Sequence, residues 1–184
     1  MPRIPYADPA GLSESKQRML KMVPANVMRM MANASDPVFD GFGALSGAFV
    51  GGNSPLPPKL REIAILRVGY LSNAAYEVFQ HEALARHVGL SDAQITAIKA
   101  GGAAAAALGE AGAAVLAFTD DLVKNVRAGD NTLAAVRKHL DDTQLVDLIL
   151  VTGLYMMVSR FLETTGVDID SSSIEWKRLA PEEA

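Results

Sequence analysis

The chain has 184 residues, no cysteine, an apolar fraction of 49%, and a formal charge of −4 from 17 basic and 21 acidic residues. This length and composition predict one domain over residues 1–184 and exclude wholesale disorder. Because no basic cluster accompanies the negative charge, nucleic acid is not an expected partner, and the absence of cysteine excludes disulfides, thiolate metal sites and thiol chemistry.

Helix signals follow one another along most of the chain. Residues 1–12 carry three prolines and are predicted to form an extended arm. Capping residues, glycines and the 3.6-residue apolar period then predict helices over residues 13–22, 25–32, 36–49, 59–71, 74–87, 91–100, 112–127, 130–140 and 141–165. An alanine run at 103–107 is helix-prone but offers little to pack, and the polar tail from 169 to 184 is expected to be loose, apart from Trp176.

No long alternating pattern typical of a strand is visible, so the predicted fold is an all-α bundle of eight or nine helices. The longest charge-free apolar run, from Leu148 to Ser159, has twelve residues. A membrane-spanning helix needs about 20. We therefore expect a buried core helix there, no membrane partner, no signal peptide at the N-terminus, and a cytoplasmic location.

The residues best suited to chemistry are Glu77 and His81, which are four positions apart and so neighbours on one helical face. Apolar residues share this face. Burial raises the pKa of a carboxyl group, and a nearby carboxylate raises that of an imidazole, so the two side chains are candidates for acid–base work near neutral pH. The alternative is a surface Glu–His pair that contributes a few tenths of a kcal/mol.

Glu62 is a third candidate, 19 residues before His81. On one straight helix the two would be about 28 Å apart. They can meet only if the chain turns between them, which Gly69 and Ser72-Asn73 favour, or if another subunit intervenes. Otherwise Glu62 is a solvated acid in the first turn of a helix. A metal held by Glu62, Glu77 and His81 is chemically conceivable, but with one histidine and no repeated ligand motif we predict no metal and no cofactor.

Three short motifs carry a family resemblance. They are Pro57-Pro58-x-x-Arg61-Glu62, Asn73-x-x-Tyr76-Glu77-x-x-x-His81 and Gly89-Leu90-Ser91. Together with the N-terminal PRIPY segment and a C-terminal stretch from Tyr155 to Asp168, they resemble the carboxymuconolactone decarboxylase family, which shares its fold with the alkylhydroperoxidase D-like proteins. The resemblance implies an all-α bundle that assembles as trimers or hexamers, with its site in a pocket between helices, often near a subunit interface.

The sequence departs from the superfamily pattern at the two positions where the peroxidase branch has its reactive cysteines. The peroxidase branch has Cys-x-x-Cys followed by histidine, and here the two cysteine positions fall on Ala74 and Glu77. No other side chain replaces a resolving dithiol, so a cysteine-dependent peroxidase is excluded. The resemblance then implies the cysteine-free, decarboxylase-type branch, with Glu62, Glu77 and His81 as a proton relay.

The implied function is a cofactor-free lyase that decarboxylates a small anionic lactone of aromatic-compound catabolism. His81 is the expected proton donor, and Glu77 or Glu62 would orient its imidazole. Arg67 and Arg160 are candidates to bind substrate carboxylates, although each is more often a structural or interfacial ion pair. Tyr76 and Tyr155 are candidates to line the pocket, although a buried, hydrogen-bonded tyrosine is the usual case.

Two alternatives remain open, because a fold does not fix a substrate. One is another proton-transfer enzyme, an isomerase or hydrolase of a small acid. The other is a non-catalytic oligomeric binding protein in which Glu77 and His81 merely satisfy each other's hydrogen-bonding groups.

Overall fold

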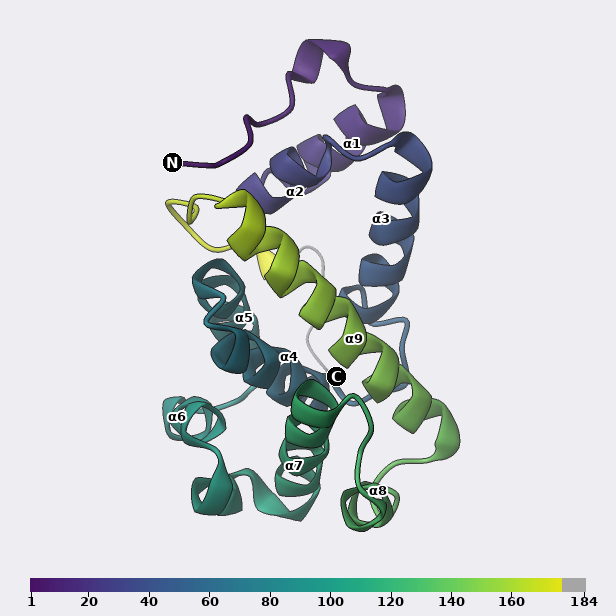
Figure 1. The fold of residues 1–184 in the computed structure, drawn as a ribbon, viewed down its shortest axis with the longest axis vertical. Helices are drawn as coiled ribbons and strands as arrows, with labels where there is room; N and C mark the ends of the chain where they lie inside the picture. Colours follow the sequence, from purple (N-terminus) through teal and green to yellow (C-terminus); the bar gives the residue numbers. More distant parts are fainter. Residues whose placement is uncertain (177–184) are drawn as a thin grey trace.

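A computed structural model describes residues 1–176, and these residues form helices joined by loops, with no strand among them (Figure 1). The elements are η1 (Pro9–Gly11), α1 (Glu14–Met22), α2 (Asn26–Met31), α3 (Asp36–Val50), α4 (Pro58–Ser72), α5 (Ala75–His87), α6 (Asp92–Ala100), η2 (Gly102–Leu108), α7 (Gly109–Asn125), α8 (Asp130–Val136) and α9 (Asp142–Thr165). The predicted all-α fold is confirmed. The alanine run forms a 3₁₀ helix, and the helix expected to reach residue 140 ends at Val136.

Helix α4 is the centre of the bundle. It packs against α5, α7 and α9, and every residue from Arg61 to Gly69 is buried. A helix buried on all sides needs apolar residues around its whole circumference, not along one stripe. Figure 1 shows α9 running diagonally through the middle of the molecule, with α1 and α2 across one end and α6, α7 and α8 at the other.

The turn between α4 and α5 brings the motif residues together. Asn73 ends α4 in the left-handed conformation (φ 52°), and the Ala74 amide donates to the Gly69 carbonyl at 2.9 Å. Asparagine tolerates this conformation better than most residues, which suits it to a helix C-terminus. The chain reverses here, so that α5 packs back on α4, as the Ser72-Asn73 signal predicts.

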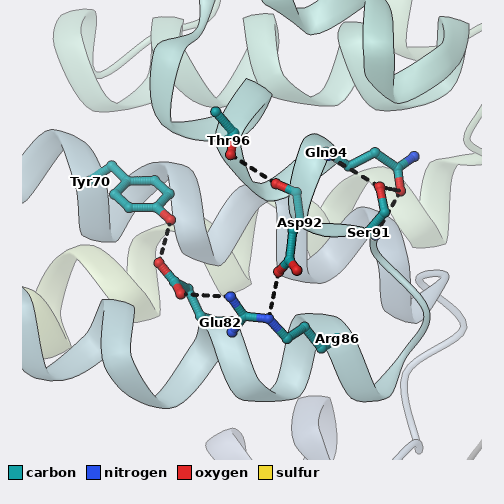
Figure 2. A network of polar contacts seen from close by, with 7 residues as sticks. All are labelled: Tyr70, Glu82, Arg86, Ser91, Asp92, Gln94 and Thr96. Atoms are coloured by element: carbon teal, nitrogen blue, oxygen red, sulfur yellow. Dashed lines mark hydrogen bonds and ion pairs between the residues drawn. The ribbon is translucent and has the colours of Figure 1, made fainter.

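The outer face of α5 is held by a polar network that joins α4, α5 and the start of α6 (Figure 2). Tyr70 donates to Glu82 at 2.9 Å, and Arg86 bridges Glu82 and Asp92 at 3.1 and 2.8 Å. These charges lie in partly or fully exposed positions. They fix α5 from outside and leave its inner face to the site.

The segment after α9 differs from the expected loose tail. Asp170 bonds to Tyr76 and to the Gln80 side chain, the Ile174 amide donates to Gln80 Oε1, and Trp176 is buried, with its indole NH donating to the Gln80 carbonyl. Residues 169–175 therefore differ from the prediction, which had excepted Trp176, because one buried tryptophan and a few polar contacts are enough to dock a polar segment. Residues 177–184 of the predicted tail lie outside the described part.

Two helical segments are long and apolar enough to cross a membrane by composition alone, Gly102–Asn125 and Asp142–Thr165. Core helices of soluble proteins pass the same test. The second segment is α9, which contributes Leu148, Val151, Leu154 and Leu162 to the main core cluster. That placement agrees with the predicted core helix.

Candidate functional site

A cavity of about 410 Å³ lies between α1–α3 on one side and α5, α9 and the docked tail on the other. Its wall is mainly apolar. The polar side chains that reach it are Ser46, Tyr76, Glu77, Gln80, His81 and Tyr155, and Trp176 adds an indole. A cavity of this size with a few polar groups is typical of a small-molecule site.

His81 is positioned by Glu62. Its Nδ1 lies 2.7 Å from Glu62 Oε2. Both residues are buried, with exposed fractions of 0% for Glu62 and 5% for His81. Glu62 also accepts a hydrogen bond from Arg61 Nε at 3.0 Å, and Arg61 Nη1 donates to the Phe49 carbonyl. Because the carboxylate serves as an acceptor for the guanidinium, Nδ1 carries the proton in the neutral ring. Nε2, which bonds to no residue in 1–176, is left for a ligand.

Glu77 has a different partner. Its Oε2 accepts a hydrogen bond from Ser159 on α9 at 2.8 Å, and its Oε1 is buried without a partner within the described residues. Burial raises the pKa of Glu77 from 4.5 to about 8, with further increases from Glu163 and Glu62, while the Ser159 hydrogen bond acts in the opposite direction. A carboxylic acid that keeps its proton near neutral pH can donate a hydrogen bond to a ligand.

The structure therefore brings Glu62, Glu77 and His81 into one region, as the turn between α4 and α5 allows. It does not pair Glu77 with His81, although both line the cavity from α5. The i, i+4 spacing shows only that two residues share a face. Glu62 and Ser159, from the neighbouring helices α4 and α9, supply the partners instead.

The two tyrosines lie at the cavity, each in its own setting. Tyr155 meets the His81 ring edge-on, with ring centroids 4.7 Å apart and an interplanar angle of 86°. Burial, and then the charges of Glu62 and Glu77, raise the pKa of Tyr155, so its phenol stays neutral. The Tyr76 hydroxyl bonds to Asp170 and accepts a hydrogen bond from the Val27 amide. Tyr76 therefore mainly connects α5 to α2 and to the segment after α9.

Neither predicted carboxylate-binding arginine lines this cavity. Arg67 makes a bidentate ion pair with Asp120 on α7, at 2.5 and 3.0 Å, and donates to the carbonyls of Ile98 and Lys99. It borders a separate hollow of about 400 Å³ on another side of α4. Arg160 is exposed and donates to the Met156 carbonyl of its own helix. Helical spacing alone does not show which side of a buried helix faces a cavity. The ion pair of Arg67 matches the structural alternative, and substrate binding by Arg67 or Arg160 stays a prediction.

Four residues that shape the site were not among the predicted site residues. Arg61 and Ser159 hold the two glutamates, Gln80 anchors the tail, and Trp176 lies 5.6 Å from the His81 ring. Two of them had a sequence signal, Arg61 as part of the first motif and Trp176 as the one tryptophan in an otherwise polar tail. Within the described residues no group of three acidic or histidine side chains could hold a metal ion.

Comparison with known proteins shows what this chain is similar to. The sequence model of the carboxymuconolactone decarboxylase family matches residues 36–120, which include Glu62, Glu77 and His81. Comparison with the sequences of curated proteins gave no match.

Solved structures resemble the whole fold. An alkylhydroperoxidase AhpD core protein from Ralstonia eutropha JMP134, called an uncharacterized peroxidase-related protein, superposes with a TM-score of 0.78 at 20% identity, over 92% of this chain and 93% of that one. A peroxidase-related protein from Silicibacter sp. TM1040 gives 0.73 at 16% identity, over 92% and 91%. A protein of unknown function from Agrobacterium tumefaciens gives 0.67 at 22% identity, over 77% and 96%.

These likenesses establish the fold, and the present chain has no cysteine with which to perform thiol chemistry. The family match and the fold agree with the motifs that contain Glu62, Glu77 and His81. The resemblance of this chain to the carboxymuconolactone decarboxylase family, on an alkylhydroperoxidase D-like fold and without cysteine, is thereby confirmed.

Proposed function

We propose that this protein is a cofactor-free acid–base enzyme that moves a proton to or from a carbon atom of a small molecule bound in the 410 Å³ cavity. One observation carries the proposal. His81, whose Nδ1 is held by Glu62, and Glu77, whose Oε1 has no partner in residues 1–176, line the same apolar cavity. A buried polar atom without a partner is costly, and such atoms are found where a ligand completes the site.

Each side chain has its own role in this proposal. His81 Nε2 accepts or delivers the proton, and Glu62 fixes the tautomer and stabilises the imidazolium as it forms. Glu77, protonated at neutral pH, donates a hydrogen bond to the substrate oxygen on which negative charge develops. Proton transfer from a positioned group contributes about 10²–10⁴-fold to a rate.

The decarboxylation of a small lactone is one specific reaction of this kind. The bond between carbon and the carboxylate breaks, its electron pair moves into the conjugated lactone carbonyl, and His81 then protonates the carbon. The family match supports this reaction. The cavity gives it less support, because none of the lysines and arginines in residues 1–176 lines the wall to hold a substrate carboxylate.

That same observation favours a second candidate, isomerisation through an enol. His81 Nε2 removes a proton next to a carbonyl, Glu77 donates to the carbonyl oxygen, and the proton returns at a different carbon. Both reactions need the same two groups. A non-catalytic binding protein is the third candidate and needs neither.

Two assays separate these candidates. In the first, carboxymuconolactone is incubated with the protein and CO₂ release is followed. In the second, the exchange of the α-hydrogens of 1-tetralone is followed by NMR in D₂O. The proposal predicts that at least one signal exceeds the uncatalysed rate and falls at least 100-fold in His81→Asn. Activity retained in that variant, or no activity in either assay, would leave a binding protein.

We also propose a homo-oligomer, a trimer or hexamer, located in the cytoplasm. Four apolar side chains of α9, Val146, Ile149, Leu150 and Met157, are exposed at helical spacing in the single chain. Such a stripe is typical of a surface that another subunit covers. Sedimentation that returns a particle of 19.5 kDa would contradict the oligomer.

A further inference from the structure

The charges around the cavity disfavour an anionic ligand. Among the described residues, 1–176, no lysine or arginine lines the cavity, and Arg61, which lies behind Glu62, is 1% exposed and already bonded to Glu62 and the Phe49 carbonyl. Apart from His81, whose charge Glu62 would already balance, the carboxyl groups nearest to the cavity are Glu62, Glu77 and Asp170, which are acidic. A ligand carboxylate would lose its hydration here and find no unpaired positive charge within residues 1–176.

The cavity is also poorly suited to an ammonium ion. Such a group has three hydrogen-bond donors. The acceptor atoms that the proposed site offers to a ligand are Glu77 Oε1 and His81 Nε2, since Glu77 Oε2 is already bonded to Ser159 and His81 Nδ1 to Glu62. With two acceptors for three donors, an ammonium ion would leave at least one donor unsatisfied in an apolar space.

The rest of the wall suits an apolar ring. Met19, Met22 and Met28 line the side formed by α1 and α2, and Leu154 and Val158 line the side formed by α9. Methionine side chains are unbranched and polarisable, so they adapt to irregular apolar surfaces and contact aromatic rings favourably.

Helix α3 leaves room for such a ring. Gly43, Gly47 and Gly51 are spaced four residues apart on one face and line the cavity. Packing explains Gly51, where a Cβ would lie 2.6 Å from the Gly47 carbonyl oxygen. It does not explain Gly47, where a Cβ would meet nothing within 4 Å, and at Gly43 only the flexible end of Met19 lies close.

We propose that the cavity binds an uncharged, largely apolar ring compound whose single polar group lies between Glu77 and His81, and that Gly47 sets the size of ligand admitted. This inference rests on the proposed function, because it assigns a substrate class to the same site. It excludes carboxymuconolactone, which is anionic, as a well-bound ligand.

The test is calorimetric titration of the full chain with three probes that share one carbon skeleton: 2-naphthylmethanol, 2-naphthoate and 2-naphthylmethylammonium. The alcohol is expected to bind at least 10-fold more tightly than either ion. In Gly47→Leu the affinity for the alcohol falls at least 10-fold because the side chain occupies the cavity. Gly41→Leu is the matched control, since Gly41 lies on the same helix, has equally open surroundings and does not line the cavity.

The outcomes separate this inference from the proposed function. Binding of the naphthoate or the ammonium ion as tightly as the alcohol overturns the uncharged class, and His81-dependent turnover of carboxymuconolactone would then keep the proposed function standing. Equal affinities in Gly47→Leu and Gly41→Leu overturn the role of Gly47. If no probe binds at millimolar concentration, the ring-ligand inference fails, while the proposed function is decided separately by the CO₂ and exchange assays.

Discussion

Nδ1 of His81 lies 2.7 Å from Oε2 of Glu62, although 19 residues separate them along the chain. The left-handed turn at Asn73 brings α5 back against α4 and makes the contact possible. The contact occupies one ring nitrogen and leaves the other for a ligand. The proposed chemistry depends on this relationship, because a rotated or inverted imidazole would present the wrong atom to the cavity.

Removing the carboxylate of Glu62 should reduce both activity and stability. Glu62→Gln keeps the size of the side chain but leaves the buried Arg61 without a counter-charge, which costs about 3 kcal/mol of unfolding free energy. Activity should fall about 100-fold, mainly in kcat, because the imidazolium loses its stabilising charge. Steady-state kinetics and denaturant titration measure the two effects. Glu110→Gln, at an exposed position in α7, is the control, and a loss of stability without a loss of kcat would reduce Glu62 to a structural residue.

The raised pKa of Glu77 makes stability depend on pH. Between about pH 4.5 and 8 the unfolded chain releases this proton while the folded protein keeps it. The contribution of protonated Glu77 to the free energy of unfolding is therefore fully present below pH 4.5 and is lost as the pH rises toward 8. Glu77→Gln lacks this dependence. The stability of the native protein relative to Glu77→Gln should therefore fall by on the order of 4 kcal/mol across this range. Urea unfolding of both proteins at pH 5 and pH 8.5 tests this. If their free energies of unfolding differ by the same amount at the two pH values, the pKa of Glu77 is not raised.

Gly69 provides space for the Glu77 carboxyl group. A Cβ at residue 69 would lie 3.2 Å from Glu77 Oε1 and 3.1 Å from Val78 Cγ2. Gly69→Ala should therefore destabilise the protein by about 1–3 kcal/mol, despite the better helix propensity of alanine. Gly153→Ala in α9, where nothing lies within 4 Å, should instead stabilise it by about 0.5–1 kcal/mol. Thermal unfolding of both variants checks the opposite signs, and a stabilised Gly69→Ala would mean that the carboxyl group lies elsewhere.

The docked tail can be followed through Trp176, the only tryptophan in the chain. Gln80→Ala removes the side-chain contacts to Asp170 and Ile174, so the indole should become exposed and its emission should shift to longer wavelength. Helical circular dichroism should stay unchanged, since the tail lies outside the bundle. Gln94→Ala, in the first turn of α6 and half-buried, should leave the emission where it is. An unshifted spectrum in Gln80→Ala would show that the indole is held by other contacts.

Much of the fold could be predicted because the residues that begin or end a helix lie next to that end in the sequence. The capping boxes at Ser91 and Asp141 and the turn at Asn73 each depend on a few adjacent residues. The 3₁₀ geometry of the alanine run could not be predicted, because alanine favours the α-helix and only the flanking glycines, Gly101 and Gly109, with φ of 66° and 73°, constrain it.

The site was predicted in part. Spacing placed Glu77 and His81 on one face, but the partner of each side chain comes from another helix, and the sequence does not show which helices are neighbours. The same limit explains Arg67, which α7 neutralises through Asp120. Contacts between distant segments, such as that of Trp176 with Gln80, depend on tertiary packing and leave no local pattern.

The most direct test of the account is the tautomer of His81, measured by long-range ¹H–¹⁵N NMR at a pH where the ring is neutral. We predict a proton on Nδ1, an unprotonated Nε2, and a shift of the Nε2 resonance when 2-naphthylmethanol is added. A proton on Nε2, or a resonance that does not respond while the alcohol binds, would contradict the claim that Glu62 turns His81 toward a ligand.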